Sequence, residues 1–230
     1  MRILIPRPAE QSEETRKKLE ALGHRVVCIP LLKVFPPEDD YQSLDSALQK
    51  LAGFDWLIFT SQNAVKAFAD RYRTLPLKTE LPKVVGVGEQ TEEAIRASGW
   101  KSFYTAKGTG EGYLVDFFAG IKKLEGQKIL LPKSKIGLDR LESFLRGKKC
   151  LVTRVVAYQT LADDSQKDIL KKELEQGFDA IFFYSPSQVE VFGSMLPTLP
   201  LKTNFYAKGE TTQKAIEKKG WRVAGLIDFF

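Results

Sequence analysis

The sequence predicts an α/β fold made of two similar parallel-sheet domains that arose by tandem duplication. One observation is the repeat itself: GFDWLIFTSQNAVKAF from Gly53 and GFDAIFFYSPSQVEVF from Gly177 agree at seven of sixteen positions, and TLPLKT recurs letter for letter at Thr74 and Thr198. The other is that each copy alternates short apolar runs with amphipathic segments, as parallel strands joined by helices do. Two copies of this length indicate paired domains, because a solenoid needs a shorter period and at least about three units.

The expected strands are the apolar runs, taken in chain order. The first is RILIPR at Arg2, followed by a helix with Ser12 as its expected N-cap and Gly23 at its end. The next strand is RVVCIPLL, and further strands are WLIFTS, KVVGVG, KILLPK, LVTRVVAY, AIFFYS and NFYAKG. Most of these runs are apolar at successive positions, as expected for a parallel sheet that is covered on both faces.

The composition indicates a globular protein whose partner is an anion. The 230 residues are 43% hydrophobic and 28% charged, with a net charge of +6. Acidic and basic residues mix along the helices and no aromatic RNA-binding signature is present, which argues against nucleic acid. No apolar stretch reaches the roughly 18 residues of a membrane helix. The charged, proline-containing start MRILIPRP argues against export, so a cytoplasmic protein is expected.

The chain lacks the side chains of several catalytic classes. His24 is the only histidine, and the two cysteines, Cys28 and Cys150, lack the C-x-x-C spacing. Metal catalysis and serine–histidine or cysteine–histidine catalysis are therefore disfavoured. No motif for a dinucleotide or a triphosphate is present either. The sequence predicts neither a cofactor nor a metal.

Polar residues gather where each expected strand gives way to a helix. These junctions are PRPAEQS, TSQN, GEQT, PKSKIG, SPSQ and GETT. In open parallel α/β sheets the carboxyl ends of the strands form the ligand crevice, and helix starts there offer unpaired N–H groups to carboxylates or phosphates. Any single junction residue can be an N-cap and nothing more. Six junctions in two copies favour a shared anion-binding cleft.

The order of these motifs resembles uroporphyrinogen-III synthase from end to end. It runs ILIPRP, IFTSQNAV, VGVGEQTEEAIRASG, ILLPKSKIGLDRL, VVAYQT, FFYSPSQVEVF and AKGETTQKAI, and the order is specific although no single motif is. The family has two flavodoxin-like α/β domains with exchanged segments, a two-stranded linker and a ligand cleft between them. The resemblance thus implies a discontinuous first domain, residues 1–35 and 159–230, and a second domain, residues 36–158. The linker segments would lie near residues 31–36 and 154–160.

The resemblance also implies a reaction. Proteins of this family convert hydroxymethylbilane to uroporphyrinogen III in tetrapyrrole biosynthesis, closing the macrocycle with inversion of ring D and loss of water. The pyrrole nitrogen can expel the hydroxyl by itself, so neither a metal nor a nucleophile is required. Catalysis then rests on positioning, with one weak acid near the leaving hydroxyl. The eight carboxylates of the substrate suit the N–H-rich junctions and the positive net charge.

Individual residues follow from the same resemblance. Tyr158 in VVAYQT matches the catalytic tyrosine that assists departure of the hydroxyl. The implied substrate-binding residues are Arg7, Thr60, Ser61, Asn63, Gly88, Thr91, Ser185, Ser187, Thr211 and Thr212. Lys208 stands where the family usually has an aliphatic residue. It either adds a partner for a carboxylate or points to solvent, and the second interpretation is favoured.

Two other functions fit parts of the sequence. A non-catalytic two-lobed module that binds a small anion would use the same junctions, and turnover distinguishes it from an enzyme. A flavodoxin-like regulator leaves the duplication unexplained, and the first strand ends lack an acidic phosphoacceptor cluster. The expected partner is the polyanionic small-molecule substrate, with no nucleic acid and no membrane. The expected state is a monomer.

Overall fold

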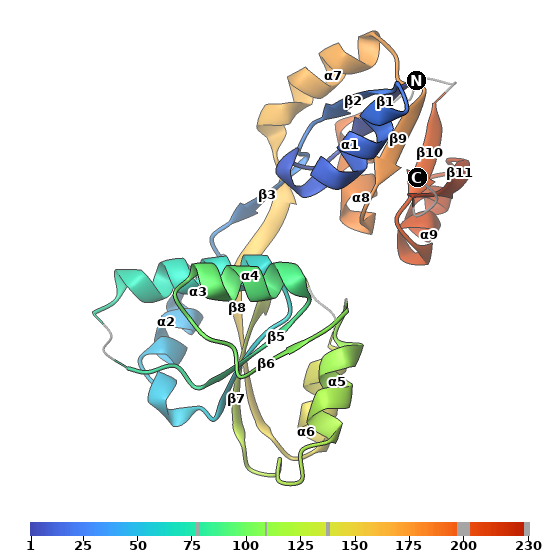
Figure 1. Ribbon diagram of the computed structural model, residues 1–230. Helices are drawn as coiled ribbons and strands as arrows, with labels where there is room; N and C mark the ends of the chain where they lie inside the picture. Colours follow the sequence, from blue (N-terminus) through green and yellow to red (C-terminus); the bar gives the residue numbers. More distant parts are fainter. Residues whose placement is uncertain (77–78, 109, 137–138, 197–202, 228–230) are drawn as a thin grey trace. The chain divides into compact units, whose positions relative to one another are not determined.

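The structure is a computed structural model that describes the chain except for residues 77–78, 109, 137–138, 197–202 and 228–230 (Figure 1). Most of the second TLPLKT, Gly137 in PKSKIG and the last three residues therefore lie outside the described part. The chain forms two compact units: unit 1 comprises residues 1–33 and 161–230, and unit 2 comprises residues 34–160. These limits differ from the expected domain boundaries by two residues at each crossing.

Unit 1 contains one sheet, in which the strands are ordered β2, β1, β9, β10 and β11. The strands are Arg2–Ile5 (β1), Arg25–Cys28 (β2), Ala180–Phe183 (β9), Asn204–Ala207 (β10) and Val223–Leu226 (β11). The helices are Glu13–Ala21 (α1), Lys167–Glu175 (α7), Pro186–Met195 (α8) and Glu210–Lys218 (α9), with 3-10 helices at Glu10–Ser12 and Asp164–Gln166. All ladders are parallel, and the order is that of flavodoxin-like sheets.

Unit 2 contains a second sheet, ordered β3, β8, β7, β4, β5 and β6. The strands are Leu32–Phe35 (β3), Trp56–Phe59 (β4), Lys83–Val87 (β5), Tyr104–Ala106 (β6), Lys128–Ser134 (β7) and Leu151–Ala162 (β8). The helices are Gln42–Leu48 (α2), Gln62–Thr74 (α3), Glu89–Ala97 (α4), Gly112–Ala119 (α5) and Arg140–Gly147 (α6), with a 3-10 helix at Leu51–Gly53.

The two sheets share one strand order. In unit 2, β8, β7, β4, β5 and β6 take the places that β2, β1, β9, β10 and β11 take in unit 1, so the same arrangement is reached by a permuted chain. The ladders β4–β5, β4–β7, β5–β6 and β7–β8 are parallel. The predicted α/β class with two similar parallel sheets is therefore confirmed.

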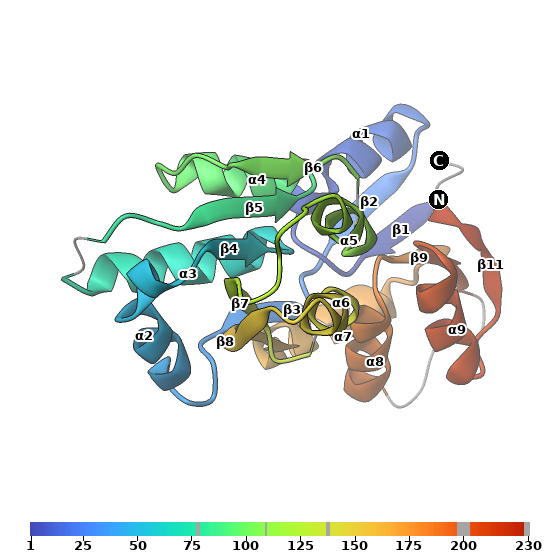
Figure 2. The same cartoon turned by 90° about the horizontal axis from the view of Figure 1, so that it is seen from below.

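Both faces of each sheet are covered, which explains the unbroken apolar runs. In unit 2, α2, α3 and α4 pack on one face around Phe59 and Phe68, and α5 and α6 pack on the other face around Ile58 and Phe118. Helix α3 lies beside α4, and α5 beside α6 (Figures 1 and 2). In unit 1, α7, α8 and α9 pack on one face, and α1 packs on the other.

The prediction of RVVCIPLL as one strand is wrong. Its first four residues form β2, residues 29–31 belong to no strand, and its last residue, Leu32, is the first of β3. Pro30 explains the break, because it has no N–H to donate to a ladder and its φ is fixed. Strand β2 joins the sheet of unit 1, whereas β3 lies at the edge of the other sheet beside β8. The chain passes between the units within these two neighbouring strands, β3 and β8.

The first helix follows the sequence prediction in its position but not in its cap. Ser12 precedes α1, but its hydroxyl donates to the Pro8 carbonyl at 3.1 Å and makes no cap bond. Gly23 follows the helix with a φ of +78°, the left-handed conformation that commonly ends helices. The sequence gives no signal for β6 and β11, because only Ala106 among their residues is fully buried. Within the described part, no helix is both long and apolar enough to cross a membrane.

Candidate active site

The candidate site residues lie near the carboxyl ends of β4, β5 and β8 in unit 2 and of β1, β9 and β10 in unit 1, on and beside one strand pair of each unit. In unit 2 this pair is β4 and β7, and in unit 1 it is β1 and β9. The helices that follow the two strands of each pair pack on opposite faces of the sheet. Such a pair is the topological switch point, where the crevice opens and where ligands of open α/β sheets bind.

Ser61 caps helix α3 at this edge of unit 2. The backbone of Ser61 is extended, with φ −160° and ψ 152°, and its Oγ accepts a hydrogen bond from the Ala64 N–H at 3.2 Å. The residue is thus the N-cap that its type predicts. The N–H groups of Gln62 and Asn63 precede the first helical hydrogen bond, so they can donate to an anion.

Tyr158, on another strand of the same sheet, contacts Ser61. It lies on β8, its side chain is 8% exposed, and its ring packs in the core cluster that contains Phe59 and Phe68. The Tyr158 Oη lies 3.1 Å from Ser61 Oγ, a distance at which either hydroxyl can donate. Because Ser61 Oγ already accepts from a backbone N–H, its own proton can point to the Tyr158 oxygen. The tyrosine then keeps its proton for another acceptor.

Gly88 shapes the neighbouring junction. It precedes α4 with a φ of +83°, and a Cβ atom built on it would lie 3.2 Å from the Gly108 carbonyl oxygen. Both the left-handed backbone and this close approach require glycine. Beside it, Gln62 Nε2 donates to Gln90 Oε1 at 3.1 Å and links the starts of α3 and α4. Sequence reasoning missed both glutamines, although they stand inside TSQN and GEQT.

Thr91 and Thr212 lie inside their units. Their exposed fractions are 4% and 1%, so their side chains pack against their own unit and only first-turn N–H groups remain for a ligand. The other predicted binding residues in these junctions are at least partly exposed: Thr60, Ser61, Asn63, Ser185, Ser187 and Thr211.

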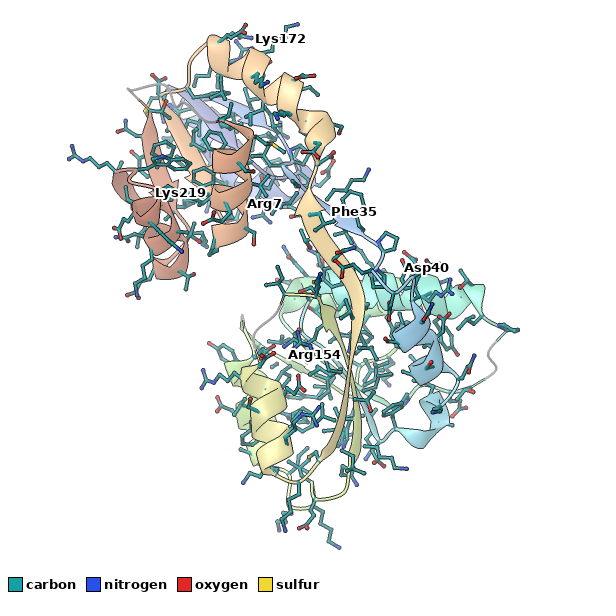
Figure 3. The ribbon with its side chains drawn as sticks, turned by 180° about the vertical axis from the view of Figure 1, so that it is seen from behind. Arg7, Phe35, Asp40, Arg154, Lys172 and Lys219 are labelled. Atoms are coloured by element: carbon teal, nitrogen blue, oxygen red, sulfur yellow. The ribbon has the colours of Figure 1, made fainter. Side chains whose placement is uncertain are left out.

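In unit 1 the matching edge carries Ser185, Arg7 and Tyr184. Ser185 caps α8 and accepts from the Gln188 N–H at 3.4 Å. Arg7, labelled in Figure 3, follows β1, and its guanidinium lies over the Tyr184 ring at 4.5 Å. Burial lowers the pKa of Arg7 and raises that of Tyr184. Sequence reasoning missed Tyr184, because a tyrosine at the end of an apolar strand looks like core.

Two lysines near these edges differ in burial. Lys208 is exposed, which favours the solvent-facing interpretation, and its backbone N–H donates to the Phe183 carbonyl at 2.8 Å. Lys133, near the end of β7, is 3% exposed, and its Nζ donates to Glu111 Oε1 at 2.5 Å. The second oxygen of Glu111, a residue that is 7% exposed, accepts from the Leu141 N–H at 3.0 Å. This pair ties α5, β7 and α6 together and was not predicted.

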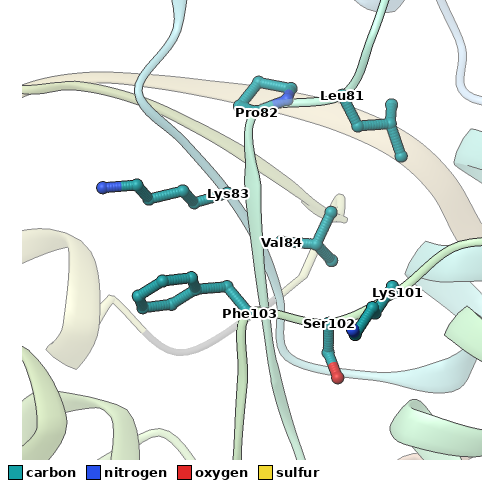
Figure 4. A pocket seen from close by; sticks show the side chains of 7 residues that line it. All are labelled: Leu81, Pro82, Lys83, Val84, Lys101, Ser102 and Phe103. Atoms are coloured by element: carbon teal, nitrogen blue, oxygen red, sulfur yellow. The ribbon is translucent and has the colours of Figure 1, made fainter.

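A shallow pocket of about 390 Å³ opens at the other end of unit 2 (Figure 4). Its lining consists of Leu81, Pro82, Lys83, Val84, Lys101, Ser102 and Phe103. Lys83 is the first residue of β5, whereas Gly88 follows the last. The pocket therefore lies at the amino ends of the strands and is not part of the candidate site.

Metal and thiol chemistry have little support in the described part of the chain. No three side chains of the types His, Cys, Asp and Glu gather there in a way that could hold a metal ion. Cys28 and Cys150 belong to different units, and burial raises the pKa of both thiols. A raised pKa disfavours the reactive thiolate.

Comparison with known proteins gives one consistent result. The family model described as uroporphyrinogen-III synthase HemD matches residues 13–225. A uroporphyrinogen-III synthase of Synechococcus elongatus is 29% identical over 84% of this chain and 74% of its own length. A porphyrin biosynthesis protein HemD of Ruminiclostridium josui is 28% identical over 96% of this chain, which spans 44% of that longer protein.

Solved structures agree on the fold. A uroporphyrinogen III synthase of Thermus thermophilus has a TM-score of 0.61 at 19% identity, and covers 98% of this chain and 92% of its own. The strand order and the polar strand ends define a two-unit α/β protein with largely parallel sheets and polar groups near the switch points. The chain belongs to the uroporphyrinogen-III synthase family. It is accordingly an enzyme of tetrapyrrole biosynthesis, in a family of cyclising lyases.

Proposed function

We propose that the chain cyclises hydroxymethylbilane to uroporphyrinogen III, with Tyr158 as the acid that assists the leaving hydroxyl. The observation that carries this proposal is the contact between Tyr158 Oη and Ser61 Oγ, 3.1 Å, at the carboxyl edge of a parallel sheet. The pyrrole nitrogen lone pair expels the hydroxyl, and the proton of Tyr158 converts it to water. The proton of Ser61 then stabilises the phenolate oxygen that remains.

The rest of the rate enhancement comes from positioning. The azafulvene formed by loss of water is attacked by the substituted α-carbon of ring D, and the spirocyclic intermediate rearranges to the inverted ring. The carbon that finally loses a proton returns it to the phenolate, so the tyrosine is regenerated. Holding the chain in the reactive geometry is worth several kcal/mol, because it replaces a search through many conformations.

The carboxylates of the substrate are the groups that the protein would bind to position it. First-turn N–H groups of α3, α4, α8 and α9 and the guanidinium of Arg7 are donors of the required kind. Hydrogen bonds to an ionised acceptor are stronger than neutral ones. Donors of this kind would distribute the binding energy of a polycarboxylate over many weak contacts. We further propose that the enzyme is a cytoplasmic monomer that binds no nucleic acid.

The direct test is product analysis. Supplied with hydroxymethylbilane, the purified protein is expected to give isomer III after oxidation and chromatographic separation of the porphyrins. Spontaneous cyclisation gives isomer I, so the ratio of the isomers measures catalysis. Formation of isomer I alone, at the rate of a protein-free control, would exclude the enzyme and leave an anion-binding module.

Comparison of Ser61→Ala with Ser185→Ala distinguishes the effect of losing a helix cap from an effect on catalysis. The two serines are repeat counterparts, and each caps a helix, so both changes are expected to lower the free energy of unfolding by about 1 kcal/mol. Both should also raise KM about fivefold through a displaced helix start. Only Ser61→Ala is expected to lower kcat, by about three- to tenfold, because only Ser61 contacts Tyr158.

A double variant completes this comparison. In a Tyr158→Phe background, Ser61→Ala should change kcat by less than about twofold, because the hydrogen bond is already lost. Steady-state kinetics with hydroxymethylbilane measures kcat and KM of the wild type, the three single variants and the double variant. Two results would show that Ser61 does not act through Tyr158. One is an equal loss of kcat in Ser61→Ala and Ser185→Ala. The other is a loss of kcat from Ser61→Ala that is as large in the Tyr158→Phe background as in the wild type.

A further inference from the structure

The duplication allows the two switch points to be compared residue by residue. RILIPR and KILLPK place Arg7 and Lys133 at the same repeat position near the carboxyl ends of β1 and β7, which are corresponding strands of the two sheets. GFDWLIFTS and GFDAIFFYS place Thr60 and Tyr184 at the same position after the neighbouring strand. The two cations are therefore equivalent in the fold, and their surroundings can be compared directly.

In unit 2 the cation, Lys133, forms a buried ion pair within the unit. Lys133 is 3% exposed and pairs with Glu111 at 2.5 Å. The carboxylate compensates the buried charge and binds the start of α6 as well. A cation that is neutralised in this way has little attraction left for an anionic ligand.

In unit 1 the cation has an aromatic neighbour in place of a carboxylate. The Arg7 guanidinium lies 4.5 Å from the centre of the Tyr184 ring, and its Nη2 donates to Gln11 Oε1 at 3.1 Å. Among the described residues, no carboxylate lies within ion-pair distance of Arg7. Arg7 is only partly exposed, so its charge is partly stripped of water, and this burial lowers the pKa of the guanidinium. A partly desolvated and unneutralised arginine gains more than a solvated one from an incoming carboxylate.

Tyr184 is held through both its hydroxyl and its backbone. Its Oη donates to Thr15 Oγ1 on α1 at 3.0 Å, and its backbone N–H donates to Gln188 Oε1 on α8 at 2.7 Å. These bonds come from the helices on opposite faces of the sheet, which flank the switch point. The repeat counterpart, Thr60, has no ring on which a guanidinium could stack.

We infer that Tyr184 is a positioning residue, which holds Arg7 as the cation that binds a carboxylate of the substrate at the switch point of unit 1. The inference rests on the proposed function, because a polycarboxylate substrate gives the cation its purpose. It makes the two units unequal: unit 2 holds the acid, Tyr158, and a neutralised lysine, whereas unit 1 holds the cation that recognises charge. The stacked ring keeps the planar guanidinium in one orientation, which suits bidentate binding of a carboxylate.

The test compares four variants with the wild type: Tyr184→Leu, Tyr184→Phe, Arg7→Gln and the double variant Arg7→Gln/Tyr184→Leu. Tyr184→Leu removes the ring and is expected to raise KM for hydroxymethylbilane about tenfold, with kcat within about twofold. Tyr184→Phe keeps the ring but loses the bond to Thr15, so an increase of about two- to threefold is expected. In the Arg7→Gln background, loss of the ring should add less than about twofold.

Tyr41→Leu is the matched control. Tyr41 stacks under Arg71 at 4.8 Å, but Asp45 neutralises that arginine at 2.6 Å. Its removal is expected to leave KM unchanged, which shows that loss of an arginine–tyrosine stack does not by itself weaken binding. Thermal melting of each variant establishes that the protein is folded.

A second readout separates this inference from the proposed function. Uroporphyrin III, the oxidised octacarboxylate product, is titrated with each protein while its fluorescence is followed. The same about tenfold loss of affinity is expected for Tyr184→Leu. If the wild type forms no isomer III, the proposed function fails while the titration still tests the arginine. Two results would overturn the positioning role of Tyr184. One is that Tyr184→Leu binds uroporphyrin III with an affinity within twofold of the wild type. The other is that Tyr184→Leu lowers this affinity equally with and without Arg7.

Discussion

Tyr158→Phe is expected to lower the rate of uroporphyrinogen III formation about ten- to a thousandfold while the fold stays intact. A single acid–base contact contributes about 10² to 10⁴, and this leaving group needs less help because the pyrrole nitrogen expels it. The substitution removes one oxygen atom. The ring can stay packed against Phe59 and Phe68 in the core cluster.

Tyr72→Phe is the matched control for this change. Tyr72 packs against the same core cluster, and its hydroxyl donates to the Thr79 carbonyl at 2.7 Å. Its loss is expected to lower the free energy of unfolding by about 1 kcal/mol without an effect on turnover. Single-turnover formation of isomer III, measured for both variants, distinguishes them. If Tyr158→Phe formed isomer III at a rate within twofold of the wild-type rate, the Tyr158 hydroxyl would have no role in the reaction.

Glu111→Ala is expected to be the most destabilising of the substitutions discussed, at about 3–5 kcal/mol, because it takes the carboxylate from a buried ammonium. Lys133 is 3% exposed and pairs with Glu111 at 2.5 Å, and the same carboxylate accepts from the Leu141 N–H. Glu111→Gln keeps an acceptor for that N–H but not the charge, so an intermediate loss is expected. Denaturant unfolding followed by tryptophan fluorescence measures both changes, since Trp56 and Trp100 lie in unit 2.

The control for the buried pair is an exposed pair in the same unit. Lys135 and Glu38 also lie 2.5 Å apart, but their side chains are 50% and 64% exposed. Glu38→Ala is therefore expected to cost less than about 1 kcal/mol. If Glu111→Ala and Glu38→Ala lowered the free energy of unfolding by similar amounts, burial of the Lys133 charge would not explain the effect of Glu111→Ala.

The local sequence determines where the ligand groups start. Ser61 and Ser185 each follow a four-residue strand that is wholly buried, and each caps the helix that comes next. These features depend on residue type and on the period of the pattern, which a short segment contains. The same reasoning failed at RVVCIPLL, where Pro30 divides the run between two sheets. It also produced no signal for β6 and β11, in which Ala106 alone is buried.

The sequence alone determined the duplication, the α/β class, the polar strand ends and, through the order of the motifs, the family. Only the tertiary structure decided which of these residues meet. Ser61 contacts Tyr158 although they are 97 positions apart, and the Arg7 guanidinium lies over the ring of Tyr184, which is far away in the sequence. Both contacts depend on strand order, which brings the ends of β4, β7 and β8 together in one unit and those of β1 and β9 together in the other. Strand order is set by packing across the whole unit, so no local pattern reveals which side chain compensates a charge or orients a hydroxyl.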